Sequence, residues 1–383
     1  MNTEQKLNIL ADSSKFDLAC ACKTGTEPGR IRGTQGRWIY PAVLPSGRKV
    51  FLLKTLQTNA CVNDCSYCPF NLQRDFPRCT LSPDELARGF MQLLDANRVS
   101  GLFLSSGVIV SPDATMEKML ATVELLRRRY QFRGFIHLKV LPGSSPTAIE
   151  QAVRLATRVS VNIEAPNASR LRQLSRKKRF YEDIVSTMEN IARLRRQINP
   201  NCKQTTQFVV GAAGESDREI VLTTARMYQK FHMERVYFSA FQNFDTYSGP
   251  TQNLLFDDSP QPRTRIGPTD SFIREHRLYQ VDFLLRRYGF SPEDIHFDDN
   301  RNLSLHYDPK LIWARRHPEF FPIDPNRADK WQLLRVPGIG PLGAQRILNA
   351  CKHQKIHHPE QLAALGIKSP KAWPYLSFGR LNR

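Results

Sequence analysis

The stretch VFLLKTLQTNACVNDCSYC, residues 50–68, joins an apolar run to a loop that carries three closely spaced cysteines. The run at 50–58 is rich in large apolar side chains, which indicates a buried β-strand. The loop places Cys61, Cys65 and Cys68 in the spacing C-x-x-x-C-x-x-C. Thiolates at such short intervals can bind one metal centre together. The stretch therefore predicts a metal site at the carboxyl end of a buried strand.

The following residues repeat this pattern of apolar runs, with amphipathic helical stretches between them. The segment 82–96, for example, begins with a Ser cap and acidic residues and then places its apolar side chains on one side. Such alternation predicts an α/β fold with a parallel sheet buried on both faces. Six units can form a partial barrel or a doubly wound sheet, and in both the chemistry lies at the carboxyl ends of the strands. The runs are residues 50–58, 99–108, 134–143, 158–166, 204–215 and 235–244.

The composition of the 383 residues, with 41% hydrophobic and 24% charged, is typical of a globular protein. The net charge of +19 favours a polyanionic partner, most simply nucleic acid, although a basic surface also serves solubility. The sequence shows neither a secretory signal nor an apolar run of about 18 residues, so we expect a cytoplasmic protein without a membrane span. In that compartment cysteines serve as metal ligands or free thiols more often than they form disulfides.

Three cysteine ligands suit an iron–sulfur cluster better than a zinc ion. A cluster of four irons that is held by three thiolates keeps one iron open, and an open metal position is where substrate chemistry takes place. A structural zinc site needs a second Cys-x-x-Cys or a His pair, and the sequence offers none beside the loop. Zinc and unligated thiols remain the alternatives.

The loop, with the aromatic Tyr67 directly before its last cysteine, resembles the signature of the radical S-adenosylmethionine (SAM) superfamily. The resemblance implies a partial (β/α)6 TIM-like barrel and two cofactors, a 4Fe-4S cluster and SAM bound at the open iron. It also implies an enzyme that cleaves SAM reductively to methionine and a 5′-deoxyadenosyl radical, which abstracts a hydrogen atom. The reducing electron would come from a donor such as flavodoxin or ferredoxin.

Two stretches correspond to backbone contacts that this family makes with SAM. The backbone around Tyr67 corresponds to an adenine contact. The residues Ser105, Ser106 and Gly107 stand in the place of the family's Gly-Gly-Glu turn, which binds the methionine amino group. Because the acid of that turn is missing here, the resemblance carries over backbone contacts alone.

Two further positions correspond to SAM contacts at strand ends. Glu164, at the end of the fourth run, corresponds to a residue that binds the SAM ribose or carboxylate. The alternative is a structural ion pair between Glu164 and Arg170. Val210 and Gly211 stand where the family has another adenine contact, and the glutamate of that pattern is displaced to Glu215.

The second motif is VPGIG at residues 336–340, which an apolar helix follows. It resembles the helix-hairpin-helix motif, which binds the DNA backbone without reading base sequence. Residues 301–383 hold fourteen Lys and Arg against five Asp and Glu, and the start of a helix favours an anion. A protein contact is the alternative. The implied nucleic-acid-binding residues are Gly338, Ile339, Gly340, Arg346 and Lys352. A second basic run at 170–179 either extends this surface or is a solvated helix face.

The two motifs predict an N-terminal extension (1–45), a radical SAM core (46–250), a linker with a helical extension (251–322) and an all-α helix-hairpin-helix domain (323–383). Together with the stretch ILADSSKFDLAC at 9–20, they resemble a bacterial family of radical SAM proteins for DNA modification or repair. That family is associated with a uracil-DNA-glycosylase-like protein. The resemblance implies radical chemistry on DNA. The alternatives are an enzyme that modifies tRNA or rRNA bases, and a DNA-binding protein whose cluster is structural or redox-active.

Overall fold

The apolar runs of the sequence form one sheet of seven strands, which follow one another in the order β1-β2-β3-β4-β5-β6-β7. The structure, a computed structural model, describes residues 1–13, 39–43, 49–241 and 268–378. Strand β1 (Ile39–Val43) is antiparallel to β2 (Lys49–Leu56), and β2 to β7 are parallel. The other strands are β3 (Gly101–Ser105), β4 (Phe135–Lys139), β5 (Arg158–Ser160), β6 (Lys203–Val210) and β7 (Arg235–Ala240).

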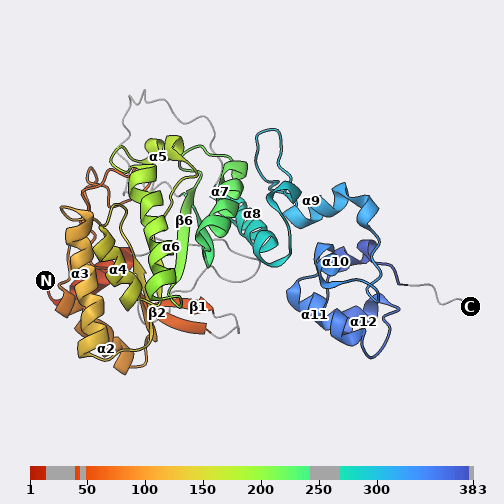
Figure 1. Ribbon diagram of the computed structural model, residues 1–383, viewed down its shortest axis with the longest axis horizontal. Coiled ribbons are helices and arrows are strands. Elements are labelled where there is room, and N and C mark those ends of the chain that lie inside the picture. The colour runs from red at the N-terminus through yellow and green to blue at the C-terminus, as the bar shows by residue number, and fades with distance from the viewer. Residues whose placement is uncertain (14–38, 44–48, 242–267, 379–383) are drawn as a thin grey trace, which may run out of the picture. The chain divides into compact units, whose positions relative to one another are not determined.

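The order of the strands decides between the two folds that the sequence left open. A doubly wound sheet reverses its strand order at a switch point. Here each parallel strand pairs with the next one along the chain, and the six parallel strands curl into a half-barrel (Figure 1). The predicted α/β partial barrel is therefore confirmed.

The two faces of the sheet differ in polarity because side chains alternate along each strand. In β6 and β7 the even-numbered residues are buried, and Phe208 stacks on Phe238 at a ring distance of 6.0 Å. Several odd-numbered residues of the same strands are only partly buried. The even positions thus build the apolar core under the helices, and the odd positions belong to the concave face of the half-barrel.

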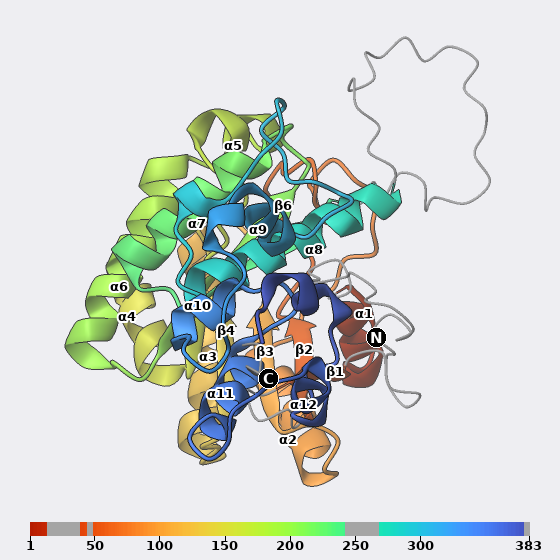
Figure 2. The same cartoon turned by 90° about the vertical axis from the view of Figure 1, so that its right-hand side faces the viewer.

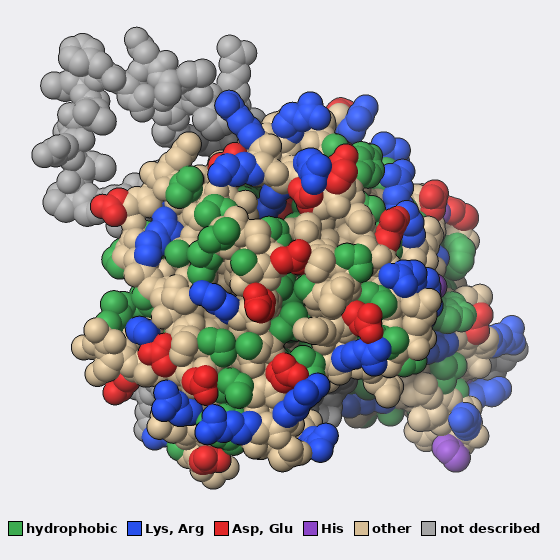
Figure 3. Space-filling view, turned by 60° about the vertical axis from the view of Figure 1, so that its left-hand side comes forward, with side chains coloured by type: hydrophobic (Ala, Val, Ile, Leu, Met, Phe, Trp, Pro, Cys, Tyr) green, Lys and Arg blue, Asp and Glu red, His purple; other side chains and the backbone are tan. Residues whose placement is uncertain are grey.

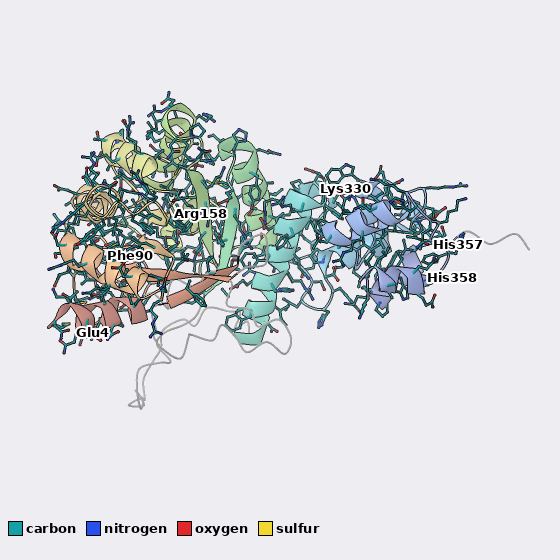
Figure 4. All side chains as sticks on the ribbon, turned by 90° about the horizontal axis from the view of Figure 1, so that it is seen from below. Glu4, Phe90, Arg158, Lys330, His357 and His358 are labelled. Atoms are coloured by element: carbon teal, nitrogen blue, oxygen red, sulfur yellow. The ribbon has the colours of Figure 1, made fainter. Side chains whose placement is uncertain are left out.

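Helices α2 to α5 of the first unit begin at side-chain caps. In α2 (Pro83–Asp95), Ser82 and Glu85 form a capping box. Phe90 of this helix, which is labelled in Figure 4, packs edge-on against Phe132 at a ring distance of 5.0 Å. Helices α3, α4 and α6 lie side by side along the sheet (Figure 2). The helices after α2 are α3 (Pro112–Glu124), α4 (Pro146–Leu155), α5 (Ala168–Leu174), α6 (Ser186–Ile198) and α7 (Asp217–Phe231), with short π-helices at Leu125–Arg129 and Phe180–Val185.

The N-terminal residues add two elements that the sequence analysis did not identify. Helix α1 (Thr3–Ser13) contacts α2 and β2, and Lys6 forms an ion pair with Glu85 at 2.7 Å. Strand β1 continues the sheet at its edge. From residue 14 the stretch at 9–20 lies outside the described residues, as do the boundaries expected at 45–46 and 250–251.

The chain divides into two compact units, residues 1–215 with 226–275, and residues 216–225 with 276–383. The second unit therefore extends well before the boundary expected at residue 323. Its core is formed by apolar side chains such as Leu334, Ile339 and Ile347. None of the described helices is long and apolar enough to cross a membrane. The remaining helices are α8 (Pro268–Arg287), α9 (Pro309–Arg316), α10 (Lys330–Arg335), α11 (Pro341–Ala350) and α12 (Pro359–Ala364), with 3-10 turns at Pro292–Asp294, Pro318–Phe320 and Pro370–Tyr375.

Candidate functional site

The three cysteines of the loop line one cavity at the carboxyl ends of the parallel strands. Cys61, Cys65 and Cys68 share this cavity with residues that follow β3, β4 and β5. The amide of Val108 donates a hydrogen bond to the Cys61 sulfur at 3.4 Å. Burial raises the pKa of Cys65, and it raises that of Cys68 to about 12. Buried thiols of this kind lose their protons when a metal supplies the compensating positive charge.

The turn at Ser105, Ser106 and Gly107 lies directly against the cysteine loop. The Gly107 amide donates to the carbonyl of Thr58 at 2.8 Å. A Cβ atom at Gly107 would lie 2.3 Å from the carbonyl oxygen of Ala60, so a larger residue cannot fit there without moving the loop. All three residues of the turn line the cavity. The Ser106 hydroxyl is buried and has no hydrogen-bond partner among the described residues, which leaves it available to a ligand.

The other side of the cysteine loop is held by residues 174–177, which we call the clasp. The Ser66 amide donates to the carbonyl of Leu174 at 2.8 Å. The Lys177 ammonium donates to the carbonyl of Val62 at 2.6 Å. Neither Val62 nor Ser66 lines the cavity, whereas Cys61 and Cys65, their neighbours in the chain, do. The loop therefore presents one side to the cavity and the other to the clasp.

Asp64 is the strongest link between the loop and the clasp. Its carboxylate accepts hydrogen bonds from the Ser175 hydroxyl at 2.5 Å and from the Arg176 amide at 3.0 Å. Burial alone would raise the pKa of Asp64, but these hydrogen bonds outweigh it and the pKa is lowered. The carboxylate thus stays ionised and fixes the middle of the loop.

Lys178, the residue after the clasp, turns into the cavity. Its ammonium lies 3.1 Å from the Glu164 carboxylate and 3.2 Å from the Tyr67 hydroxyl, and all three residues line the cavity. Burial would lower the pKa of Lys178, but the negative charges of Cys65 in its thiolate form and of the Glu164 carboxylate outweigh it and raise the pKa. A positive charge is therefore held beside the cysteines.

Glu164 occupies a strained backbone position at this cavity. Its φ angle is +64°, in the left-handed region that non-glycine residues rarely adopt. Its amide donates to the Gln207 carbonyl at 3.0 Å, and its own carbonyl accepts from the Val209 amide at 2.9 Å. Strain of this kind costs of the order of 1–3 kcal/mol and concentrates at functional sites. Within the described residues the ion-pair partner of Glu164 is Lys178, and not the Arg170 that the sequence suggested.

The adenine contact predicted at Val210 and Gly211 differs from the other predicted SAM contacts, because these two residues do not line the cavity. Val210 is 2% exposed and belongs to the apolar face of β6, while its neighbour Val209 lines the cavity. The Gly211 amide donates to the Glu215 carboxylate at 2.5 Å, so Glu215 caps the turn after β6. Neither Val210 nor Gly211 is among the residues that line the cavity.

Several other residues that form the site were not predicted from the sequence. In the sequence Lys178 is one residue of the basic run at 170–179. Asn162 and Gln207 line the cavity, and they lie within the predicted runs at 158–166 and 204–215, where strand alternation could have indicated them. Arg78 anchors the segment after Cys68, because its guanidinium donates to four backbone carbonyls.

The cavity suits a 4Fe-4S cluster by the chemistry of its donors. No three His, Cys, Asp or Glu side chains in the described parts of the chain are grouped closely enough to hold a single metal ion. A cubane cluster does not require such a group, because each thiolate binds its own iron. Cys61, Cys65 and Cys68 would hold three irons, and the polar lining from Ser106, Glu164 and Lys178 faces the space beside them.

The predicted hairpin in the second unit forms a tight turn between α10 and α11. Gly338 has a φ angle of +85°, and a Cβ atom there would lie 2.2 Å from the Ser369 hydroxyl oxygen. Ile339 is 1% exposed and anchors the turn in the core, and Gly340 directly precedes α11. The Arg346 guanidinium donates to the Leu365 carbonyl at 3.0 Å.

A second turn of the same kind follows α12, and the sequence analysis did not identify it. Gly366 has a φ angle of +82°, and the next residue, Ile367, is 5% exposed.

The turn at Gly338 is also held by Lys310, whose ammonium donates a hydrogen bond to the Ile339 carbonyl at 2.5 Å. Burial lowers the pKa of Lys310 to about 7. Of the predicted nucleic-acid-binding residues, Arg346 and Lys352 have exposed side chains.

A parallel half-barrel with three thiols at the carboxyl ends of its strands suits the binding of an iron–sulfur cluster. Residues 56–226 match the family model described as the Radical SAM superfamily, so the chain carries a radical SAM superfamily domain. Members of this superfamily use a 4Fe-4S cluster and SAM, which confirms both predicted cofactors. The matched residues include the cysteine loop and all strands from β3 to β6.

The solved structures that this chain resembles include a maturase, a synthase and a methyltransferase. The FeFe-hydrogenase maturase HydG from Carboxydothermus hydrogenoformans is 16% identical, with 61% of this chain and 51% of that chain covered and a TM-score of 0.44. Methylornithine synthase (PylB) is 14% identical, with 61% and 63% covered and a TM-score of 0.42. The methyltransferase TsrM from Kitasatospora setae is 13% identical, with 61% and 43% covered and a TM-score of 0.40. The chain spans about half the length of the maturase. No protein of curated function matches it.

Proposed function

We propose that this protein is a radical SAM enzyme that acts on DNA, in modification or repair. The observation that carries the DNA assignment is the turn at Gly338 and Gly340, which precedes α11 in a strongly basic part of the chain. The observation that carries the enzyme assignment is the cavity that the three cysteines line, within the radical SAM domain.

Different residues of the cavity would bind the two cofactors, the 4Fe-4S cluster and SAM. When bound, the cluster and SAM supply a 5′-deoxyadenosyl radical by reductive cleavage. Cys61, Cys65 and Cys68 hold the cluster. The Ser106 hydroxyl and the Lys178–Glu164 pair offer one neutral and two charged groups to the polar end of SAM.

The hairpin would position DNA through its backbone. The N–H groups at the start of α11 and the positive end of the helix dipole favour a phosphate. Lys352, exposed just beyond the end of α11, adds a charge that releases counterions from DNA. Such contacts grip a duplex without reading its sequence, so the chosen base must be recognised elsewhere.

The test is anaerobic reconstitution of the cluster, followed by incubation with SAM, dithionite and either duplex DNA or structured RNA. We expect 5′-deoxyadenosine to form faster with DNA, and mass spectrometry of the digested nucleosides to reveal a modified nucleoside. The variant Cys65→Ser is the control that abolishes cleavage with either nucleic acid. Faster cleavage with RNA would assign the enzyme to RNA modification, and equal rates together with no DNA affinity at low salt would overturn a nucleic-acid substrate.

A further inference from the structure

We propose that the exposed outer side of the clasp is the docking surface for an acidic protein that carries one electron. The surface consists of Arg172 at the end of α5 and of Arg176 and Lys177 in the clasp. This proposal rests on the proposed radical SAM activity, because that activity consumes one electron in each cleavage of SAM.

The position of these residues follows from the two-sided arrangement of the cysteine loop. Cys61 and Cys65 face the cavity, where SAM and substrate must lie, while Val62 and Asp64 face the clasp. The side chain of Lys177 is exposed to solvent, and its ammonium donates a hydrogen bond to the Val62 carbonyl at 2.6 Å. A single layer of residues therefore separates solvent from the backbone of the cluster loop on this side. An electron carrier that docks there comes close to the cluster without entering the cavity.

The charge of the surface identifies the kind of carrier. Arg172, Arg176 and Lys177 all have exposed side chains. Figure 3 shows Lys and Arg side chains gathered at the top of the first unit, at the height where Figure 1 places α5. A positive surface attracts a negative partner during diffusion and raises the association rate at low salt. Electron-transfer encounters are small and transient, so a few exposed charges suffice to define one.

A nucleic acid could also be attracted to this charge, but the geometry favours the carrier. Arg172, Arg176 and Lys177 do not line the cavity, which is where a substrate nucleotide would have to react. The Arg176 amide and the Lys177 ammonium contact the side of the loop that faces away from the cavity. In the proposed step one electron passes from the reduced carrier to the oxidised cluster. The carrier is oxidised by one electron, and no bond or proton is transferred.

The test compares two charge reversals of equal size. The first variant, Arg172→Glu with Arg176→Glu, reverses two exposed charges whose side chains make no hydrogen bond to the loop. The matched control, Arg193→Glu with Arg196→Glu, reverses two exposed charges in the last turns of α6. Since α6 leads into the amino end of β6, the control lies at the opposite end of the half-barrel. Cluster loading is checked by iron content in both variants.

The measurement is the rate of cluster reduction in an anaerobic stopped-flow instrument, with a reduced acidic flavodoxin or with dithionite as donor. We expect the first variant to be reduced by flavodoxin at least tenfold more slowly, with a weaker dependence on salt, and the control to behave as the unaltered protein. Dithionite should reduce all three proteins at the same rate, and their affinities for DNA should be equal.

The docking surface is overturned if flavodoxin reduces the first variant as fast as the unaltered protein, or if it reduces both variants equally slowly. A selective loss of DNA affinity in the first variant would instead assign the surface to nucleic acid. If dithionite-reduced protein fails to cleave SAM, the proposed activity itself fails, whichever surface the carrier uses.

Discussion

The buried ion pair between Lys178 and Glu164 allows a prediction about the stability of the site. The two charged groups lie 3.1 Å apart, and their side chains are 12% and 5% exposed. At an effective dielectric constant of about 20, unit charges at this distance attract each other by about 5 kcal/mol, and the cost of burying them offsets part of that energy. The variant Lys178→Met leaves the Glu164 carboxylate buried without its partner. We expect it to lower the free energy of unfolding by about 3–5 kcal/mol.

The assay is urea denaturation of the cluster-free protein at neutral pH, because cofactor binding then makes no contribution. The double variant Lys178→Met with Glu164→Gln removes both charges, and we expect it to regain most of the lost stability. The control is Lys230→Met, which breaks an exposed pair with Glu189 at 2.7 Å, with side chains 61% and 49% exposed. An exposed pair of this kind contributes less than about 1 kcal/mol. The reasoning is refuted if Lys178→Met is no less stable than Lys230→Met, or if the double variant is as unstable as the single one.

Three further predictions concern the loop and the hairpin. Gly107→Ala places a methyl group against the Ala60 carbonyl, so we expect reconstituted protein to hold much less iron, measured by a colorimetric assay. The control is Gly343→Ala in α11, where the atoms nearest to the added Cβ are side-chain atoms of Ile367 and Ile339, at 3.3 Å and beyond, and not backbone. Lys310 has a pKa of about 7 in the folded protein, against an ordinary value of 10.5. Between these two pH values the unfolded chain binds more protons than the folded protein, so the free energy of unfolding should rise with pH across that range. Urea denaturation at pH 7 and pH 10 would show this rise, and it should be smaller in Lys310→Met. Lys352→Ala removes one phosphate contact, so a salt titration of DNA affinity should have a slope that is smaller by about 1, and an unchanged slope would count against this contact.

The features that the sequence predicted well are those that local patterns determine. The cysteine spacing and the alternation of apolar runs with helices depend on residues close in the chain, and both appear in the structure. The order of the strands, and with it the choice of a half-barrel, depends on pairing between distant segments. Strand β1 was missed because Pro41 interrupts its apolar stretch, and a proline within such a run argues against a strand. The turn at Gly366 was missed because it lacks the second glycine of the VPGIG motif and leads into a 3-10 turn instead of an α-helix.

The site could be predicted only in part for a related physical reason. Each thiol ligand is recognisable from its spacing, but Lys178 reaches Tyr67 across 111 residues of sequence. Nothing in a run of basic residues shows which of them turns inward. The φ angle of Glu164 was likewise not predictable, because the pairing with β6 on both sides of that residue imposes it.

The basic run at 170–179 therefore cannot be treated as one surface. Lys178 points into the cavity and is paired with Glu164, whereas Arg176 and Lys177 are exposed on the other side of the cysteine loop. Neutralising the whole run would remove a buried partner and an outer surface together, and a loss of activity would then have two causes. Separate variants resolve them, because Lys178→Met acts on the stability of the cluster-free protein and Arg176→Glu does not touch the buried pair. Of the residues in this run, the exposed ones on the outer side of the cysteine loop can meet another protein, and the buried Lys178 cannot.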